Sequence, residues 1–563
     1  MRYWKGRQTD DGSVHCMGNG RLAVYEQGPD IIQLFGPPYS SNSYIKLNII
    51  ENGDIEAESE RKAGTAIWSH KIYKGKRMIG EITDFVDADT ACMARKLGLA
   101  EQVDFLLVYD EKINVLDNKE RFKDYEISAG LLSFAEAGMF IYNRYPNPHR
   151  AYHQFIATGN LSCVENNSHN QFKISCGPGE SFIFIIGGPS YPECIENSES
   201  ILKTSYEMLF DRTLAFWKYF TGRRYNFENI IPENFSKRDS LISAIDDVSV
   251  LIKAQQGKEG GVLAGHNYHL GYIRDQYGVS RALLKLGYLD EAKAVLRFYW
   301  NIWKKYGILH NAQAIGLDGI FHIHENDEVE ITGYLVIQAF DYYSASGDDS
   351  FLEEIFPMLE WAWNVQKKNL VNNMLPFNGD ETYIAGGILP RSCINDGSAE
   401  ATLLFITGGE KLIEWAGKRG LWTKNRIDEE ACVLKNTIDS YRSNFWESGK
   451  LYANNPDRTL FFNAPKFRHG VCEICYDNMV WTERNRHGYY TCPKCWNSTK
   501  RKDSAKERYY LKSVSLTPIY IGATLFSNDE ISALTNDIVN QYEQTGKLPS
   551  RPDGSITVGY DYG

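Results

Sequence analysis

The sequence predicts a multi-domain chain of the β + α class, in which an antiparallel β-sandwich precedes a ring of helical hairpins with a zinc-ribbon insertion. Three patterns predict it: short apolar runs in the first third, apolar residues at three- and four-residue spacing beyond them, and two late Cys-x2-Cys pairs. A chain of 563 residues also exceeds the usual size of one hydrophobic core. We expect a sandwich over 1–197, a helical linker over 198–235, a helical domain over 236–563 and the ribbon over 466–500.

The sandwich is predicted from four segments with the character of strands. They are residues 21–25, 31–35, 105–109 and 182–186, each a short apolar run bounded by Gly, Pro, Asn or Asp. Short strands with frequent turn residues are typical of an antiparallel sandwich.

The helical part begins with Ser198 to Phe220, which is expected to form one linking helix. Asp290 and Asp349 are the expected N-caps of two later helices. Tight and long connections alternate, so a closed ring would bring its long loops to one face. A solenoid is the alternative, but no fixed repeat period is visible. The expected helices are 239–256, 275–287, 289–306, 327–346, 349–370, 396–418, 425–446, 513–525 and 528–543, and the long loops are 257–274, 307–326, 371–395 and 544–558.

Composition narrows the possible partners. A net charge of −11 argues against bulk binding to nucleic acid or anionic lipid. The chain has no apolar run of 18 or more residues, and its first residues lack the apolar core of a signal peptide. The aromatic content of 13% fits either a large aromatic core or stacking platforms for sugar rings. We expect a cytoplasmic enzyme with a neutral ligand, and a homo-oligomer is compatible with this composition.

The first long loop ends in Gly271-Tyr272-Ile273-Arg274-Asp275, at the start of a predicted helix. Arginine offers a planar fork of donors, and aspartate offers a matching pair of acceptors. Together they can bind neighbouring hydroxyls of a sugar from both sides. A salt bridge at the start of the helix is the alternative interpretation.

The second long loop ends in the acidic segment 322–330. Its His-x-His-Glu string suggests a metal site, but no further ligand pattern supports one. Acidic residues at a helix start also complement the helix dipole. We expect Glu325 or Asp327 to line the site, and Glu328 and Glu330 to be capping or solvated.

The third long loop contains Asp380 and Glu381 between Gly379 and Thr382-Tyr383. Aromatic neighbours and a second carboxylate raise the pKa of a carboxyl group, so that it can remain protonated near neutral pH. A solvated turn is the alternative, because Asn, Gly and Asp are turn formers. Arg391 follows in the same loop.

These segments resemble family 15 glycoside hydrolases, the glucoamylase and microbial trehalase group. Segment 271–275 is similar to the family's Trp/Tyr-x-Arg-Asp motif, 379–383 to its Asp-x-Trp-Glu region with the general acid, and 18–22 to a recurring start of its sandwich. The resemblance implies an (α/α)6 barrel as catalytic domain and inverting, exo-acting hydrolysis of α-glucosides, with Glu381 as general acid. Substrate binding would fall to Tyr272, Arg274, Asp275, Glu325, Asp327, Asp380 and Arg391.

The chain departs from the family pattern in two places. No Trp stands just before Glu381, and residue 563 falls near the start of a tenth ring helix, whereas six hairpins need twelve. The family's general base lies just before the last helix. Asp553 and Asp561 are the late loop carboxylates available for this role, and a base beyond residue 563 is the alternative.

Two other functions remain open at this point. Inverting phosphorylases share the architecture, and His266, His269 and Arg391 are available for a phosphate pocket. A non-catalytic protein that binds a sugar or a partner is the third possibility.

Four cysteines form the pattern C-x2-C-x16-C-x2-C, namely Cys472, Cys475, Cys492 and Cys495. Four thiolates in two knuckles suit tetrahedral Zn²⁺ with no open position, so the metal would be structural, and no cofactor is expected for catalysis. Iron or a redox pair is the alternative. The insert is basic, but docking to a protomer or support of the ring's rim is favoured over nucleic-acid binding.

The other seven cysteines show no disulfide framework, which indicates a reducing compartment.

Overall fold

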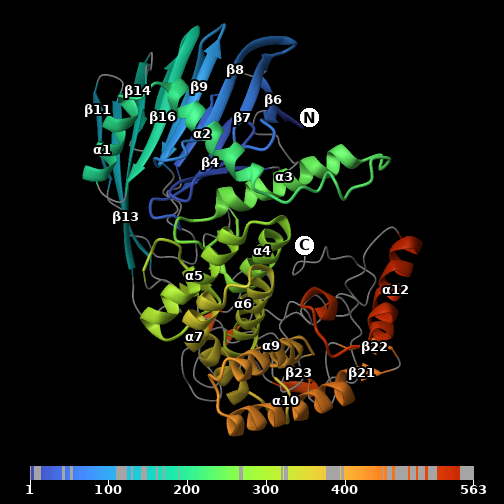
Figure 1. Cartoon of the computed structure of the whole chain (residues 1–563). Coiled ribbons are helices and arrows are strands. Elements are labelled where there is room, and N and C mark those ends of the chain that lie inside the picture. Colours follow the sequence, from blue (N-terminus) through green and yellow to red (C-terminus); the bar gives the residue numbers. More distant parts are fainter. Residues whose placement is uncertain are drawn as a thin grey trace. The chain divides into compact units, whose positions relative to one another are not determined.

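The computed structural model divides the chain into two compact units. The strand unit comprises Met1–Tyr272, Ala282–Tyr299 and Ala312–Phe321, and the helical unit comprises Ile273–Arg281, Trp300–Asn311 and His322–Gly563 (Figure 1). The structure describes residues 2–5, 14–40, 45–50, 55–109, 123–128, 131–140, 149–159, 163–168, 171–188, 191–265, 270–318, 321–322, 327–375, 393–394, 399–447, 449–452, 459–462, 480–481, 490–491, 501–504 and 517–545.

Two antiparallel sheets form most of the strand unit, which confirms the predicted N-terminal β class. One sheet has the order β1 (Arg2–Lys5), β6 (Ile55–Arg61), β7 (Trp68–Lys74), β8 (Arg77–Val86), β9 (Cys92–Leu99), β16 (Gly179–Gly188), β13 (His149–Gly159), β12 (Leu131–Phe140) and β11 (Lys123–Ser128). The other has the order β14 (Cys163–Ser168), β15 (Gln171–Cys176), β10 (Val103–Tyr109), β5 (Ile45–Ile49), β4 (Asp30–Phe35), β3 (Ala23–Gln27) and β2 (His15–Gly18).

The strands follow from the apolar runs. Along β5, buried Ile45, Leu47 and Ile49 alternate with half-buried residues, as expected for a strand with one face on the core. All four predicted strand segments lie within or overlap strands of the structure, namely β3, β4, β10 and β16.

The predicted linking helix is two helices. α1 covers Tyr191–Leu202 and α2 covers Tyr206–Gly222, so the prediction of one helix over 198–220 was wrong. Ser205 interrupts it in an extended conformation, and its side chain accepts a hydrogen bond from the Met208 N–H. This is an N-cap, which satisfies a free N–H group of the new helix. α3 (Arg238–Gln255) follows.

Helices α4 (Ile273–Leu286) and α5 (Leu289–Tyr306) are each divided between the two units. The other long helices belong to the helical unit: α6 (Thr332–Ser346), α7 (Asp349–Lys368), α9 (Ala399–Lys418), α10 (Lys424–Phe445) and α12 (Asn528–Thr545). The predicted helices were therefore largely correct, but a helix predicted over 513–525 ends at Tyr520. Gly522 follows with a φ of +66°, which a right-handed helix cannot contain.

The two predicted caps were wrong, by one position at α7 and by two positions at α5. The N-cap of α7 is Asp348, whose side chain accepts from the Phe351 N–H at 3.1 Å, and Asp349 is the first helical residue. Asp290 is the second residue of α5.

Helices α6 and α9 are buried along nearly their whole length, whereas α10 is buried along one face. Trp363 of α7 stacks on Phe405 of α9 with ring centroids 4.2 Å apart. Gly409 makes this close approach possible, because a Cβ there would lie 2.4 Å from the Trp363 ring. A helix that is apolar on all sides has to be surrounded by others, so α6 and α9 form the core of the unit.

A π-helical turn, η1 (Asp327–Ile331), leads directly into α6. Such turns are rare and often occur at functional sites.

The segment that contains the four-cysteine pattern lies, in sequence, between two paired strands of the helical unit. β23 (Thr459–Phe462) pairs with β26 (Arg501–Ser504), and β20 (Cys393–Ile394) pairs with β23. Between them, β24 (Val480–Trp481) pairs with β25 (Tyr490–Thr491). The four cysteines themselves lie outside the described residues, so the zinc ribbon remains a prediction.

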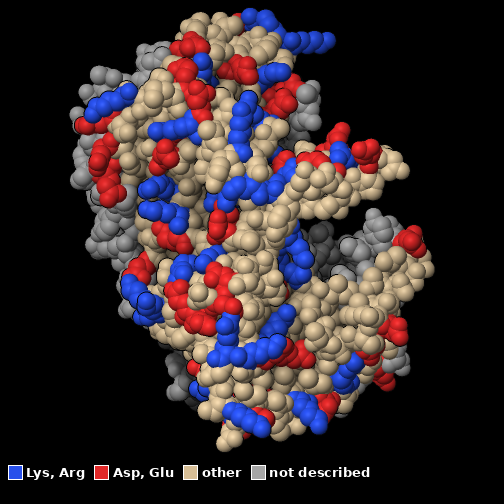
Figure 2. Space-filling model, in the orientation of Figure 1, with Lys and Arg blue, Asp and Glu red and all other residues tan. Residues whose placement is uncertain are grey.

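Among the described residues, no helix is long and apolar enough to cross a membrane. On the face drawn in Figure 2, the described acidic and basic side chains are interspersed over the surface.

Candidate functional site

Arg274, in the first turn of α4, pairs with a buried carboxylate of the helical unit. Arg274 donates from Nη1 to Glu330 Oε1 at 2.7 Å. Glu330 is 4% exposed and comes from η1, so the pair joins two segments that are 56 residues apart in sequence. A hydrogen bond between two charged groups is about twice as strong as a neutral one and fixes the orientation of the arginine.

Glu330 was expected to be capping or solvated, and that prediction was wrong. Its neighbour Glu328 is exposed, as predicted, and its carboxylate accepts from Asn369 Nδ2 at 3.1 Å. One feature of the sequence could have indicated this burial: Glu330 comes just before the apolar residues of α6. An acidic side chain buried at such a position needs a positively charged partner.

The residues around Arg274 are placed by local structure. Tyr272 precedes α4 in an extended conformation and packs against a small buried cluster of Leu270, Ala312 and Ala314 in the strand unit. Asp275 is exposed in the first turn, where its charge is favourable to the helix dipole. The Ile273 N–H donates to the Asn311 carbonyl at 3.0 Å, which anchors the helix start within the helical unit.

The structure does not test most of the predicted site. Asp327 begins η1, but its side chain is not described. The remaining predicted site residues lie outside the described residues and stay predictions: Glu325, Asp380, Glu381, Arg391, Asp553, Asp561, His266 and His269.

Buried tyrosines and one glutamate connect α4, the helix that holds Arg274 in its first turn, to its neighbours. The Tyr334 hydroxyl donates to Glu400 Oε1 at 2.6 Å, and both residues are at most 4% exposed. The Tyr277 ring lies 5.1 Å from that of Tyr334 and 5.5 Å from that of Tyr520. Burial raises the pKa of Tyr277 well above its usual value, so its hydroxyl stays protonated. This network connects α4, α6, α9 and the segment 517–520.

A second cluster of charged residues lies between the two sheets of the strand unit. Glu26, His70, Asp84 and Arg95 are each fully buried, and we call them the charge cluster. Arg95 donates to both Asp84 oxygens at 2.8 and 2.7 Å. His70 Nε2 lies 3.5 Å from Glu26 Oε2 and 3.4 Å from Asp84 Oδ2, and its Nδ1 lies 2.8 Å from Ser59 Oγ.

One imidazole and two carboxylates are a donor set that a divalent metal can use. Here, however, Arg95 already occupies both Asp84 oxygens and lies 3.7 Å from Glu26. Arg95 and His70 supply the positive charge that the two carboxylates need, so no metal ion is required. We therefore interpret the charge cluster as an ionic network that joins the sheets.

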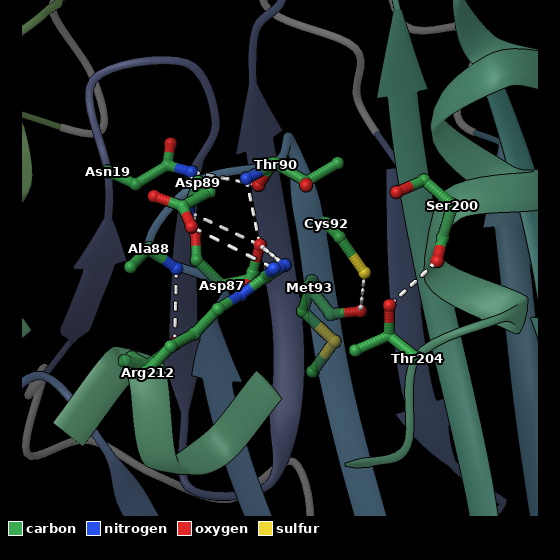
Figure 3. A network of polar contacts seen from close by, with 11 residues as sticks. Asn19, Asp87, Ala88, Asp89, Thr90, Cys92, Met93, Ser200, Thr204 and Arg212 are labelled. Carbon is green, nitrogen blue, oxygen red and sulfur yellow. Dashed lines mark hydrogen bonds and ion pairs between the residues drawn. The ribbon is translucent and has the colours of Figure 1, made fainter. Parts of the chain in front are cut away.

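The segment Gly18–Leu22 has a structural role. Asn19 donates from Nδ2 to the carbonyls of Asp87 and Thr90 at 2.7 and 2.9 Å, while its Oδ1 accepts from the N–H groups of Arg21 and Leu22. Figure 3 shows the same turn held from α2, where Arg212 donates to both Asp87 oxygens at 2.5 Å. The asparagine therefore ties two turns of the strand unit together.

No protein-family model matches the chain, and no curated protein matches it either. Among solved structures, a bacterial glucoamylase in complex with acarbose aligns with 98% of this chain and 93% of its own, at a TM-score of 0.56 and 10% sequence identity. A family 92 α-mannosidase from Bacteroides thetaiotaomicron aligns with 96% of this chain and 73% of its own, at a TM-score of 0.48 and 9% identity. The chain therefore shares the fold of the glucoamylase, a pair of antiparallel sheets followed by a helical domain.

Proposed function

We propose that this protein is an exo-acting, inverting glycoside hydrolase that acts on α-glucosides. The observation that carries the proposal is the Arg274–Glu330 pair, which holds a guanidinium in the first turn of α4, where the next residue, Asp275, is exposed. A fixed donor fork next to an acceptor pair is suited to bind the hydroxyls of a terminal sugar. The fold shared with the glucoamylase supports the same conclusion.

In this proposal the helical domain completes an (α/α)6 barrel, and its long loops surround the sugar. Glu381 protonates the glycosidic oxygen. A second carboxylate, Asp553 or Asp561, activates water on the opposite face, at the separation of roughly 6.5–9.5 Å that inversion requires. Tyr272, Arg274, Asp275, Glu325, Asp327, Asp380 and Arg391 bind the substrate.

The first test is turnover of a panel of α-linked glucosides by the wild-type protein, with and without inorganic phosphate, and with the anomer of the released sugar followed by NMR. Glu381→Gln is expected to lower kcat by about 10²–10⁴-fold while sugar binding persists, because a positioned general acid contributes a factor of this size.

The matched control is Glu429→Gln, an exposed position on α10, which should leave kcat unchanged. Full activity of the Glu381 variant would refute the assignment of the acid. Strict dependence on phosphate would instead identify a phosphorylase, and sugar binding without turnover would identify a binding protein.

We further propose that Cys472, Cys475, Cys492 and Cys495 hold one structural Zn²⁺ and that the protein works in the cytoplasm. A four-thiolate zinc site has no position for a substrate, so the zinc takes no part in the reaction. Among the described cysteines, Cys16, Cys92, Cys176 and Cys432 are free thiols, which suits a reducing compartment.

A further inference from the structure

Glu330 reaches Arg274 from an irregular turn. In η1 the backbone hydrogen bonds span five residues instead of four, so the turn is wider than that of an α-helix. This changes the direction in which the Glu330 side chain leaves the backbone relative to those of α6. The carboxylate of Glu330 thereby lies against the guanidinium of Arg274 at 2.7 Å.

The turn is stabilised by a side chain from the neighbouring helix. Gln366 of α7, 1% exposed, donates from Nε2 to the Val329 carbonyl at 2.7 Å. A buried carbonyl without a donor would cost about 1–3 kcal/mol, so this hydrogen bond helps to hold the irregular turn in the folded protein.

Gly333 provides the space for that hydrogen bond. A Cβ at this position would lie 2.9 Å from Gln366 Nε2 and 2.7 Å from the Leu404 Cβ. Three helices therefore meet closely here, through Gly333 of α6, Gln366 of α7 and Leu404 of α9. Gln366 contacts Val329, the residue before Glu330 in sequence.

We propose that Glu330 is a positioning residue for Arg274, held in place by the π-turn and by Gln366, and that it sets the orientation in which Arg274 meets a sugar. This inference rests on the proposed function for the identity of the ligand, but not for the contact itself. A guanidinium is planar and carries five N–H donors, and the bond to Glu330 fixes the position of Nη1, the end of the group that carries two of them.

The test combines enzyme kinetics with a reactivity measurement that needs no substrate. Glu330→Gln keeps the size of the side chain and removes its charge. We expect KM for the hydrolysed α-glucoside to rise about 10–100-fold with little change in kcat, because Arg274 contacts the sugar in both the ground state and the transition state. In an Arg274→Ala background the same change should have no further effect, since Glu330 acts through Arg274.

The second measurement is the rate at which phenylglyoxal modifies Arg274, followed by mass spectrometry. Loss of the paired carboxylate should raise this rate several-fold in Glu330→Gln. Glu330→Asp, which keeps the charge but shortens the side chain, should change both readouts in the same direction by less. Glu328→Gln, an exposed position in the same turn, is the control and should match the wild type.

The outcomes separate the two proposals. An unchanged modification rate in Glu330→Gln and Glu330→Asp would overturn the positioning role, whatever the activity. Additive effects of the Arg274 and Glu330 changes on KM would also overturn it. A raised modification rate in a protein that hydrolyses none of the α-glucosides would support the positioning role and refute the proposed function.

Discussion

The charge cluster places four ionisable side chains, Glu26, His70, Asp84 and Arg95, in the interior of the strand unit. Removing an ion from water costs several kcal/mol, and only close, well-oriented partners offset that cost. Burial opposes ionisation of Asp84, but Arg95 and His70 outweigh it and hold the pKa of Asp84 at about 2. Burial would also lower the pKa of His70, yet the carboxylates of Asp84 and Glu26 raise it to about 9.

Glu26 is the member of the charge cluster that titrates near neutral pH. Burial and the adjacent Asp84 raise the pKa of Glu26 from 4.5 to about 7. Between these values the folded chain keeps a proton that the unfolded chain has released, so stability falls as the pH rises from about 4.5 through 7. A shift of this size corresponds to a few kcal/mol at most, on the order of 3.

We therefore expect Glu26→Gln to be about as stable as the wild type at pH 5 and more stable by about 1–3 kcal/mol at pH 8, because an amide does not ionise. Urea unfolding at both pH values measures the difference. Glu60→Gln, an exposed position on β6, should follow the wild type at both. Equal pH dependence of the Glu26 variant and the wild type would contradict the prediction.

At the scale of elements, the turn between β2 and β3 docks on the segment that follows α3. The Lys258 N–H donates to the Gly20 carbonyl at 2.9 Å, and the Tyr39 hydroxyl donates to the Ala254 carbonyl at 2.5 Å. Gly18 lies so close that a Cβ there would be 2.0 Å from the Ala254 oxygen. The strand turn and the helix end therefore meet through backbone atoms.

Gly18→Ala is expected to destabilise the protein by about 1–3 kcal/mol, because the added methyl group forces these backbones apart. Gly98→Ala on β9 is the matched control, since a Cβ there would have no atom within 4 Å, and it should be close to neutral. Denaturant unfolding of the two variants decides the point. A Gly18 variant as stable as the control would show that the turn is not tightly packed.

Apolar periodicity predicted most elements of the fold, but not the departures from it. The break at Ser205 escaped prediction because apolar residues recur on both sides of it and one hydroxyl decides it. The π-turn escaped because spacings of four and five residues cannot be told apart over a single turn. At the candidate site, the sequence of the first long loop indicated Arg274 as a candidate binding residue. Its pairing with Glu330 could not be predicted, because the two residues are 56 positions apart in sequence.

In the chain as a whole, the predicted zinc ribbon is bounded in sequence by the paired strands β23 and β26. We expect purified protein to contain one zinc ion per chain by elemental analysis. Cys475→Ser should remove it, because three thiolates no longer complete the tetrahedral site. Cys432→Ser, which changes an exposed free thiol on α10, should leave the zinc content unchanged. Iron in place of zinc, or full zinc content in the Cys475 variant, would contradict the prediction.

The division of the chain into units has a consequence for its synthesis. In the strand unit, Ser40 donates its N–H to the Ile315 carbonyl at 2.9 Å, and its hydroxyl accepts from the Ile315 N–H at 2.7 Å. These residues are 275 positions apart. A ribosome that adds about 5–20 residues per second needs roughly 14–55 seconds to make the segment between them. For that time the segment around Ser40 is made but its backbone partner Ile315 is not, so these two hydrogen bonds can form only after most of the helices α1 to α5 have been translated.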